Sequence, residues 1–346
     1  MPELQVSAIV PARNEEANIA GAVESLAAQT VPLEIIVVND ASTDGTGSIL
    51  AELQQRLPQL KVVETGELPP GWTGKNYAVA CGVAQARAPW LLLTDADVRH
   101  APNGVEAGLA AARQSGAAMV SYSPDQELLT WWERATIPFV YCRLSSEYPY
   151  EQVSDPEDSV AAANGEWLLV SRTAYDAVGG HEAVKDEMLE DVALARRLKR
   201  SGCRLHFARG VNLARSRMYL SLGEMWEGWS KNLFLLFDRR KGTVASAVVG
   251  AALDTLVWLF LLVAIWGAWQ GWPVGRWLVI FLAGVIGWRH LRYAQALRRN
   301  RYPLSSLPYY TLGSVLFAAL MLHSARKYLA GEPVRWKGRD YQAPAK

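Results

Sequence analysis

Gln5-Val-Ser-Ala-Ile-Val-Pro11 opens the chain with a run of apolar residues that is long enough for a buried strand. An Ala-rich stretch of helical composition follows as far as Gln29, and Leu33–Val38 is a second apolar run. The alternation continues with helices expected at 46–57 and 74–86 and strands expected at 61–64 and 90–94. Apolar strands separated by helices are typical of a parallel sheet that is covered on both faces. The sequence therefore predicts an α/β fold with a parallel sheet that is covered by helices.

Charge is divided unevenly along the chain. Residues 1–238 hold 20 Lys and Arg against 31 Asp and Glu, whereas residues 239–346 hold 15 against 3, so the net charges of the two parts are −11 and +12. Seven of the 14 Trp residues lie in the basic part, beside long apolar runs. A basic segment that binds nucleic acid would not carry such runs, so the pattern favours a membrane, and no nucleic acid, as the partner.

The basic part contains runs that are long enough to cross a bilayer. Residues 243–269 include a single charged residue, Asp254, and at about 1.5 Å per residue they can span the hydrocarbon core. Residues 302–325 form a second run without charge, and 273–290 is a weaker candidate that contains Arg276. We therefore predict an α/β domain at 1–235 and a membrane domain at 236–346, with spans at 243–269, 273–290 and 302–325.

Basic clusters flank these runs at 239–241, 289–301 and 326–339. Such clusters favour the cytoplasm, and three full spans cannot place all of them on one side, so one run is expected to be re-entrant or interfacial. The first strand follows no signal peptide, and the three cysteines show no paired spacing, which fits a reducing compartment. We expect a multi-pass protein of the cell (inner or plasma) membrane with its α/β domain in the cytoplasm.

Two carboxylates, Asp95 and Asp97, follow the strand expected at 90–94. Side chains alternate along an extended chain, so both are expected on one side, where hard oxygen ligands can reach a divalent cation. The carboxyl end of a strand is also where an open α/β sheet binds its ligand. A solvated turn after the strand is the alternative explanation.

Polar residues also follow the first two strands, in Pro11-Ala-Arg-Asn-Glu15 and Asn39-Asp-Ala-Ser-Thr-Asp-Gly45. Carboxylates and amides at neighbouring strand ends suit hydrogen bonds to a nucleobase and a ribose. The second segment can equally form an Asx-type turn that caps the next helix. We expect Thr43 and Asp44 in that structural role and Asp40 at the ligand.

Glu190 and Asp191 open a helix that continues Val-Ala-Leu-Ala-Arg-Arg-Leu. Carboxylates in the first turn of a helix are stabilised by the helix dipole, which accounts for one of them without any function. Attack by a hydroxyl group needs a general base within reach, and we assign that role to Asp191.

Together these segments resemble the inverting glycosyltransferase family 2 over about residues 4–235. The catalytic domain of that family has the GT-A fold, so the resemblance implies a Rossmann-like α/β domain with a mixed, mainly parallel sheet and helices on both faces, followed here by the transmembrane helical region. The resemblance implies that Asp191 is the catalytic base and that Asp97 holds a divalent metal, Mg²⁺ or Mn²⁺. It implies that a nucleotide-sugar donor, expected to be a UDP-sugar, is bound by Pro11, Arg13, Glu15, Asp40, Lys75 and Asp95. On the acceptor side it places Asn164, Gly165, Glu166 and Glu190.

The region after the base departs from the processive members of the family, which carry Gln-x-x-Arg-Trp. This chain reads Trp226-Glu-Gly-Trp229-Ser-Lys-Asn232 instead, which is similar to members that glycosylate carotenoid or hopanoid-type lipids and to ceramide glucosyltransferases. Trp226 and Trp229 are therefore expected to stack on a lipid or other hydrophobic acceptor. Their three-residue spacing also suits packing within a helix.

Two other functions stay open from the sequence. A polyprenyl-phosphate glycosyltransferase has a phosphate acceptor, which needs little help from Asp191. A non-catalytic membrane scaffold would lack acidic ligands, whereas Asp40, Asp95, Asp97 and Asp191 are all present. A dinucleotide-binding enzyme would show Gly-x-Gly-x-x-Gly after the first strand, and this chain does not.

Overall fold

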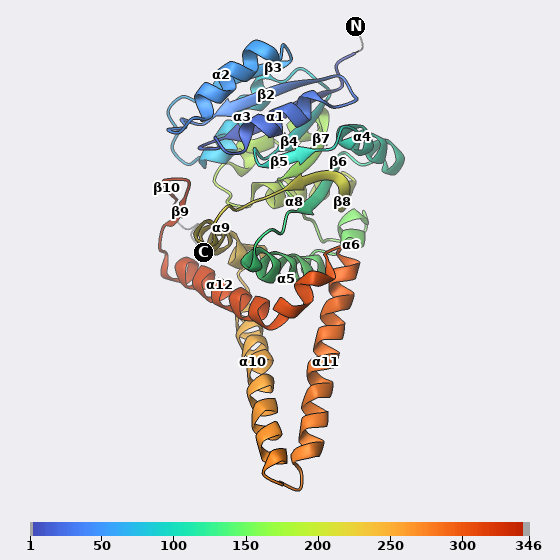
Figure 1. The fold of residues 1–346 in the computed structure, drawn as a ribbon. Coiled ribbons are helices and arrows are strands. Elements are labelled where there is room, and N and C mark those ends of the chain that lie inside the picture. Colours follow the sequence, from blue (N-terminus) through green and yellow to red (C-terminus); the bar gives the residue numbers. More distant parts are fainter. Residues whose placement is uncertain (1–2, 342–346) are drawn as a thin grey trace.

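The computed structural model describes residues 3–341 and shows an α/β domain, a helical layer beneath it and a helical hairpin that projects away from both (Figure 1). The strands of the central sheet lie in the order β3-β2-β1-β4-β7-β6-β8-β5. Their bounds are β1 (Val6–Ala12), β2 (Leu33–Asn39), β3 (Leu60–Glu64), β4 (Trp90–Thr94), β5 (Val98–His100), β6 (Met119–Gln126), β7 (Trp167–Ser171) and β8 (Leu205–Ser216).

Helices cover both faces of this sheet, as the sequence predicts. One face packs against α1 (Ile19–Ala27), α2 (Thr46–Arg56) and α4 (Gly104–Ser115). The other packs against α3 (Gly74–Gln85), α6 (Tyr150–Ser154), α7 (Arg172–Ala177), the 3-10 helix η1 (Gly180–Val184) and α8 (Glu190–Arg200). Ala8, Ile9 and Val10 of β1 are fully buried because neighbouring residues point to opposite faces and each face is covered. The predicted α/β class is confirmed.

One reversal of strand direction determines where the functional residues meet. β1, β2 and β4 are parallel, whereas β7 runs antiparallel to β4, with Thr94 opposite Trp167. Residues just before β7 therefore lie at the same edge as residues just after β4. Before β7, the side chain of Asn164 accepts a hydrogen bond from the backbone N–H of Glu166 (3.0 Å) and forms a turn, so the strand begins at Trp167.

Beneath the sheet, α5 (Trp131–Glu147), α9 (Leu222–Leu236) and α12 (Tyr310–Ala330) share an aromatic core. The stretch around α5 reads as irregular in the sequence because it carries Pro138, but a capping box between Thr130 and Glu133 starts a continuous helix. α12 approaches α5 so closely that a side chain at Gly313 would collide with the carbonyl oxygen of Ala135.

The projecting hairpin consists of α10 (Lys241–Trp269) and α11 (Gly275–Arg299), and η2 (Leu304–Tyr309) leads from it into α12 (Figure 1). Large apolar side chains cover its surface; Phe281 is 65% and Trp277 74% exposed. Asp254 of α10 is buried between the other two helices, where it pairs with Arg289 (2.5 Å) and accepts a hydrogen bond from Ser314 (2.7 Å). This ion pair ties the three helices together.

Within residues 3–341, two helical segments are long and apolar enough to cross a membrane, Lys241–Trp269 and Leu304–Ala330. The first is far more exposed, with 17% of its apolar window buried against 39% in the second. Figure 1 shows why, since α10 stands free in the hairpin whereas α12 lies across the hairpin's base beside α5. The three spans expected from the sequence stay predictions.

The chain ends in a small hairpin of β9 (Val334–Trp336) and β10 (Arg339–Tyr341). It follows α12 and returns to the α/β domain, where it contacts residues that follow β1 and β2. The sequence gives no expectation of this contact, because it joins positions roughly 300 residues apart.

Glu133 offers a test of how α5 is held. Its carboxylate is completely buried, accepts hydrogen bonds from the N–H groups of Leu129 and Thr130, and pairs with Arg217 (2.9 Å). Glu133→Gln leaves Arg217 without its anion, so we expect a loss of about 2–4 kcal/mol in the free energy of unfolding, measured by chemical denaturation in detergent. Glu224→Gln changes the matching but exposed cap of α9 and should cost less than about 1 kcal/mol; equal losses in both variants would refute the assignment.

Candidate active site

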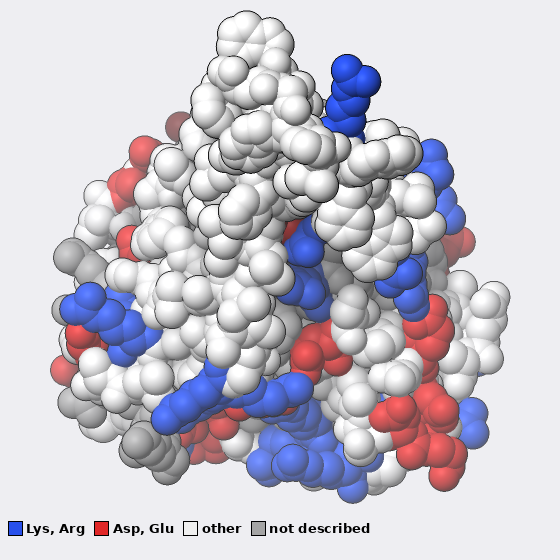
Figure 2. All heavy atoms as spheres, turned by 90° about the horizontal axis from the view of Figure 1, so that it is seen from below, with Lys and Arg blue, Asp and Glu red and all other residues white. Residues whose placement is uncertain are grey.

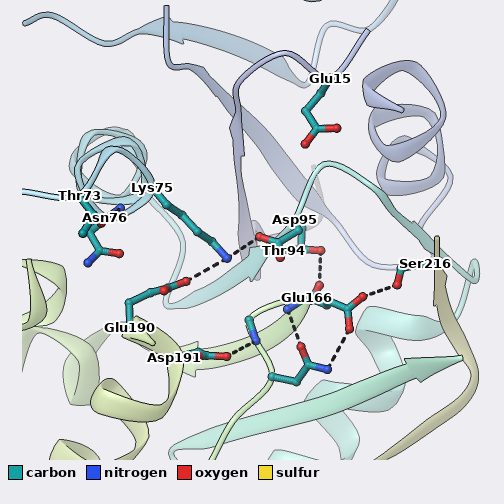
Figure 3. Close-up of polar contacts among 12 residues, drawn as sticks. Glu15, Thr73, Lys75, Asn76, Thr94, Asp95, Glu166, Glu190, Asp191 and Ser216 are labelled. Carbon is teal, nitrogen blue, oxygen red and sulfur yellow. Dashed lines mark hydrogen bonds and ion pairs between the residues drawn. The ribbon is translucent and has the colours of Figure 1, made fainter. Parts of the chain in front are cut away.

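Charged residues from distant parts of the chain meet at one edge of the sheet (Figure 3). Asp40 follows β2, Asp95 follows β4, and Asn164–Glu166 precede β7. Lys75 lies in the first turn of α3, and Glu190 and Asp191 lie in the first turn of α8. The topology therefore assembles most of the residues expected from the sequence.

Lys75 lies at the centre of this group. Its ammonium contacts Asp95 (2.7 Å) and Glu190 (2.9 Å), so it joins the donor-side and acceptor-side carboxylates (Figure 3). Burial would lower the pKa of Lys75, but Asp95 and Glu190 raise it well above its usual value, which keeps the side chain cationic. Asn76 holds the start of α3 in place by donating to the carbonyl oxygens of Val184, Lys185 and Glu187.

The two carboxylates of α8 have different protonation behaviour. Burial tends to raise the pKa of Glu190, but Lys75 overrides it and the pKa is lowered. Burial, and then the charge of Glu190, raise the pKa of Asp191 to about 7 against the opposing effect of Lys75. Environments that separate the pKa values of two neighbouring acids are typical of acid–base sites. Asp191 is therefore suited to exchange a proton near neutral pH.

Asp191 is held at the junction by Gly165, whose backbone N–H donates to its carboxylate (2.8 Å). A Cβ atom at Gly165 would lie 3.3 Å from both Asp191 Oδ2 and Lys75 Nζ. Glycine therefore permits the close approach of the turn before β7 to both charged groups.

Asp97 has a buried carboxylate oxygen that could bind a cation. Its Oδ1 atom is buried and has no hydrogen-bond partner among the described residues. Burial, followed by the charges of Asp95, Glu166 and Glu15, raises its pKa well above the usual value, whereas Lys337 opposes the rise.

The part of the chain that the structure describes contains no cluster of three or more His, Cys, Asp or Glu side chains arranged to hold a metal. A magnesium-like cation bound to a diphosphate needs only one or two protein carboxylates, because phosphate oxygens and waters complete its shell. The unpaired oxygen of Asp97 beside Asp95 fits such a cation.

Glu166 has a supporting role in this geometry. Its buried carboxylate accepts hydrogen bonds from Asn164 (2.9 Å), Tyr141 (3.2 Å) and Ser216, and its carbonyl oxygen accepts one from Thr94 (2.7 Å). These bonds join β4, α5, the turn before β7 and β8. Glu166 therefore fixes the floor of the site, although the sequence alone does not distinguish this role from contact with a ligand.

The residues expected around the nucleotide lie at the ends of β1 and β2. Arg13 donates to the carbonyl oxygens of Asp40 (2.6 Å) and Ala41 (3.1 Å), so it shapes the loop after β2. Asp44 accepts from the backbone N–H and hydroxyl of Thr46, as expected for a helix-capping turn. Pro11 lines a small cavity beside Lys75 and Asp95.

A larger cavity of about 180 Å³ opens next to Asp191. Its lining combines polar residues, including Lys75, Asp95 and Asn164, with apolar or aromatic ones, including Tyr141, Leu144, Tyr148, Phe207, Met218, Trp229 and Leu236. Trp229 is buried against Tyr141 and Tyr219. Trp226 is not among the lining residues and packs on His323 of α12 instead, so the two tryptophans do not act together here.

The sequence reading missed two groups of charged residues. Lys231 lines the cavity, and burial lowers its pKa to about 8 against the effect of Glu190. Lys337 and Arg339 of the C-terminal hairpin contact Glu15 and Asp40. The sequence signal for Lys337 and Arg339 is the concentration of basic and aromatic residues after α12.

Comparison with known proteins gives a consistent result. Residues 7–175 match the model of the family described as Glycosyl transferase family 2. A 4,4'-diaponeurosporenoate glycosyltransferase of Staphylococcus aureus (strain MRSA252) is 26% identical over 343 residues, which cover 96% of this chain and 87% of that protein. This relative confirms the expected likeness to carotenoid-type lipid glycosyltransferases.

Among solved structures, a mannosyltransferase from Pyrobaculum calidifontis, in complex with GDP-Man and Mn²⁺, has a TM-score of 0.54 and 18% identity. The match covers 94% of this chain and 87% of that one, and it confirms the GT-A-like fold class.

Removing the central cation tests the charge balance of the site. Lys75→Met leaves Asp95 and Glu190 unpaired, so we expect a loss of roughly 1–3 kcal/mol in the free energy of unfolding at pH 8, measured by chemical denaturation. Because the lowered pKa of Glu190 stabilises the fold above the usual glutamate pKa, the difference from wild type should shrink as the pH falls below 4.5, toward the lowered pKa. Lys185→Met, which removes an exposed pair with Glu182 (2.9 Å), should cost less than about 1 kcal/mol. A loss for Lys75→Met that does not vary with pH would contradict this charge balance.

Proposed function

Because this chain carries a glycosyltransferase family 2 domain at residues 7–175 and is a glycosyltransferase, we propose that it transfers a sugar from a nucleotide-sugar to a hydroxyl of a lipid-like acceptor. The observation that carries the proposal is the position of Asp191, at the junction between the charged sheet edge and the partly apolar cavity. A carboxylate at that place can reach both reactants.

In the proposed reaction, Asp191 accepts the proton of the acceptor hydroxyl while the hydroxyl oxygen bonds to the anomeric carbon of the sugar. The bond from that carbon to the diphosphate breaks in the same displacement, so the nucleoside diphosphate leaves and the anomeric configuration inverts. A carboxylate with a pKa of about 7 is well matched to this proton transfer near neutral pH.

The donor side has groups suited to a nucleoside diphosphate. Asp40, at the end of β2, is proposed to bind the nucleoside. Lys75 is proposed to place its ammonium near the diphosphate. Asp97, with Asp95 beside it, would hold a divalent metal, and the metal when bound would neutralise charge on the leaving diphosphate. The neighbour from Pyrobaculum, which holds GDP-Man and Mn²⁺, supports a metal-dependent nucleotide-sugar reaction. We propose a UDP-sugar as the donor and Mg²⁺ or Mn²⁺ as the metal.

The acceptor side has the character of a lipid site. Aromatic and aliphatic side chains of α5, β8 and α9 line the cavity away from Asp191, and these elements belong to or adjoin the layer beside α12. The relative from Staphylococcus aureus bears the name of a carotenoid-type acceptor, which supports a hydrophobic substrate. We place Asn164, Gly165 and Glu166 at the polar end of this acceptor site.

A polyprenyl-phosphate acceptor is the second candidate. Lys231 supports it, because a buried cation in the same cavity as Lys75 suits a phosphate group. A phosphate oxygen is already a nucleophile at neutral pH, so that reaction would not depend on a base.

The hairpin of α10 and α11 is proposed to anchor the enzyme in a membrane. Seen from below, uncharged side chains cover most of the projecting surface, whereas Lys and Arg side chains gather around its base (Figure 2). The clusters at 239–241 and 298–301 lie at the same end of the hairpin, next to the catalytic domain. Two spans, α10 and α11, place both basic clusters on the cytoplasmic side. α12 then lies along the membrane–water interface and does not cross the membrane.

One assay tests the function as a whole. Protein in detergent is given a panel of nucleotide-sugars with Mn²⁺ or Mg²⁺, and release of the nucleoside diphosphate is measured with and without native lipid extract. We expect metal-dependent release from one donor that increases with lipid, together with a sugar-labelled lipid. No release from any donor with lipid present would contradict the proposal.

Replacing the base separates the two candidate acceptors. Asp191→Asn should lower kcat by roughly 10²–10⁴-fold with a hydroxyl acceptor, because the variant cannot take up the proton. In wild type, kcat/KM should rise with pH and level off above about 7, where Asp191 is ionised. Asp176→Asn, on the exposed side of α7, is the matched control and should retain full activity. A loss of less than about tenfold for Asp191→Asn would favour the phosphate acceptor.

The metal assignment is tested at Asp97. Asp97→Asn should weaken Mn²⁺ binding in the presence of a nucleoside diphosphate by at least about tenfold, the scale on which even outer-shell changes act. Electron paramagnetic resonance of Mn²⁺ measures this directly, and Asp186→Asn provides an exposed control. Unchanged Mn²⁺ binding and activity in Asp97→Asn would exclude Asp97 as the ligand.

A further inference from the structure

The C-terminal hairpin of β9 and β10 is built to bring two cations to the sheet edge. Its turn residues, Lys337 and Gly338, both have positive φ (46° and 76°), as a tight two-residue turn between antiparallel strands requires. Lys337 therefore occupies the tip of the hairpin, and Arg339 begins the returning strand.

Val334 of β9 packs into the core of the helical layer, whereas the charged side chains of the hairpin contact the donor side of the site. The ammonium of Lys337 pairs with Glu15, and the guanidinium of Arg339 contacts both carboxylate oxygens of Asp40. Arg13 donates to the carbonyl oxygen of Lys337 (3.0 Å), which holds the turn in place.

A further contact reaches the start of α3. The N–H of Gly74 donates to the hydroxyl of Tyr341 (3.3 Å), and a side chain at Gly74 would collide with Arg339. The hairpin thus touches Glu15 and Asp40, which the proposed function assigns to the nucleotide, and Gly74, which precedes Lys75.

The charges of the hairpin indicate a role in binding an anionic ligand as well as in packing. Glu15, Asp40, Asp95 and Asp97 gather at the sheet edge, and a nucleoside diphosphate would add further negative charge. The ammonium of Lys337 is close enough to Asp97 to act on it electrostatically, and its side chain is about one-third exposed, at 30%. Cations that face both the carboxylates and the donor position can offset the charge of a diphosphate.

We propose that the β9–β10 hairpin forms one wall of the donor site and that Lys337 and Arg339 bind the nucleoside diphosphate part of the donor. This inference rests on the proposed function. When the donor binds, the hairpin shifts, Lys337 passes from Glu15 to a phosphate oxygen, and Arg339 shares its contacts between Asp40 and the nucleotide. The donor site is therefore completed by a segment that follows the membrane-associated helix α12 directly.

Nucleotide binding to the full-length protein tests this inference. Binding of UDP and GDP in the presence of Mn²⁺ is measured by calorimetry for wild type, Lys337→Ala, Arg339→Ala and Lys337→Arg. We expect the two alanine variants to raise the Kd at least about tenfold and Lys337→Arg to stay within about threefold of wild type, since each lost charge-assisted contact is worth about a factor of ten. Arg326→Ala, an exposed cation of α12, should bind as wild type does. Thermal unfolding midpoints confirm that each variant is folded, and Arg339→Lys replaces Arg339→Ala if the latter unfolds.

The outcomes distinguish the inference from the function on which it rests. If wild type binds a nucleoside diphosphate but the folded alanine variants bind equally well, the hairpin is only a structural clasp and the inference is wrong. Tighter binding by the variants would show that the hairpin blocks the site, which also overturns it. If wild type binds neither nucleotide, the proposed function fails and the inference falls with it.

Discussion

Carboxylates crowded at the edge of a sheet stay ionised only if cations lie beside them, and Lys75 supplies the central cation of this protein. It bridges Asp95, which follows β4, and Glu190, which opens α8, so one ammonium joins the donor side to the acceptor side. Its place depends on the cap of α3 and on Asn76, which binds three carbonyl oxygens. The different pKa values of Glu190 and Asp191 follow from this arrangement, because Lys75 contacts the first and only partly offsets the burial of the second.

The sequence predicts those parts of the site that depend on local pattern. Apolar strands separated by helices indicate a parallel sheet, and the carboxyl ends of such strands meet at one edge, so the sequence alone places both Asp40 and Asp95 at strand ends that can bind a ligand. The role of Asp44 in a capping turn was also predictable, because it depends on neighbours two residues away. Asp191 was assigned as the base from its place at the start of a helix, and the resemblance to a glycosyltransferase family supported it and added the turn before β7. No spacing rule connects Gly165 with a helix 26 residues later.

The features that sequence reasoning missed depend on contacts between distant residues. Glu166 is expected on the acceptor side, but the sequence does not show that its carboxylate also accepts hydrogen bonds from Tyr141 of α5 and Ser216 of β8, which hold the floor of the site. Trp226 and Trp229 share one helix, yet only Trp229 faces the cavity, because α12 covers the other. The contacts of Lys337 and Arg339 join the two ends of the chain, and neither periodicity nor local motifs report such a pairing.

The site thus brings a charged donor edge and a partly apolar cavity together at Asp191, above a helical layer that also supports the proposed membrane hairpin. We propose that a hydrophobic acceptor enters the cavity from the side of the helical layer and that the nucleotide binds at the charged sheet edge. The central claim of the proposed function is a single displacement at the anomeric carbon with Asp191 as the base. The configuration of the transferred sugar, determined by NMR of the isolated product, tests that claim most directly. The account predicts a configuration opposite to that of the donor, and retention would contradict it.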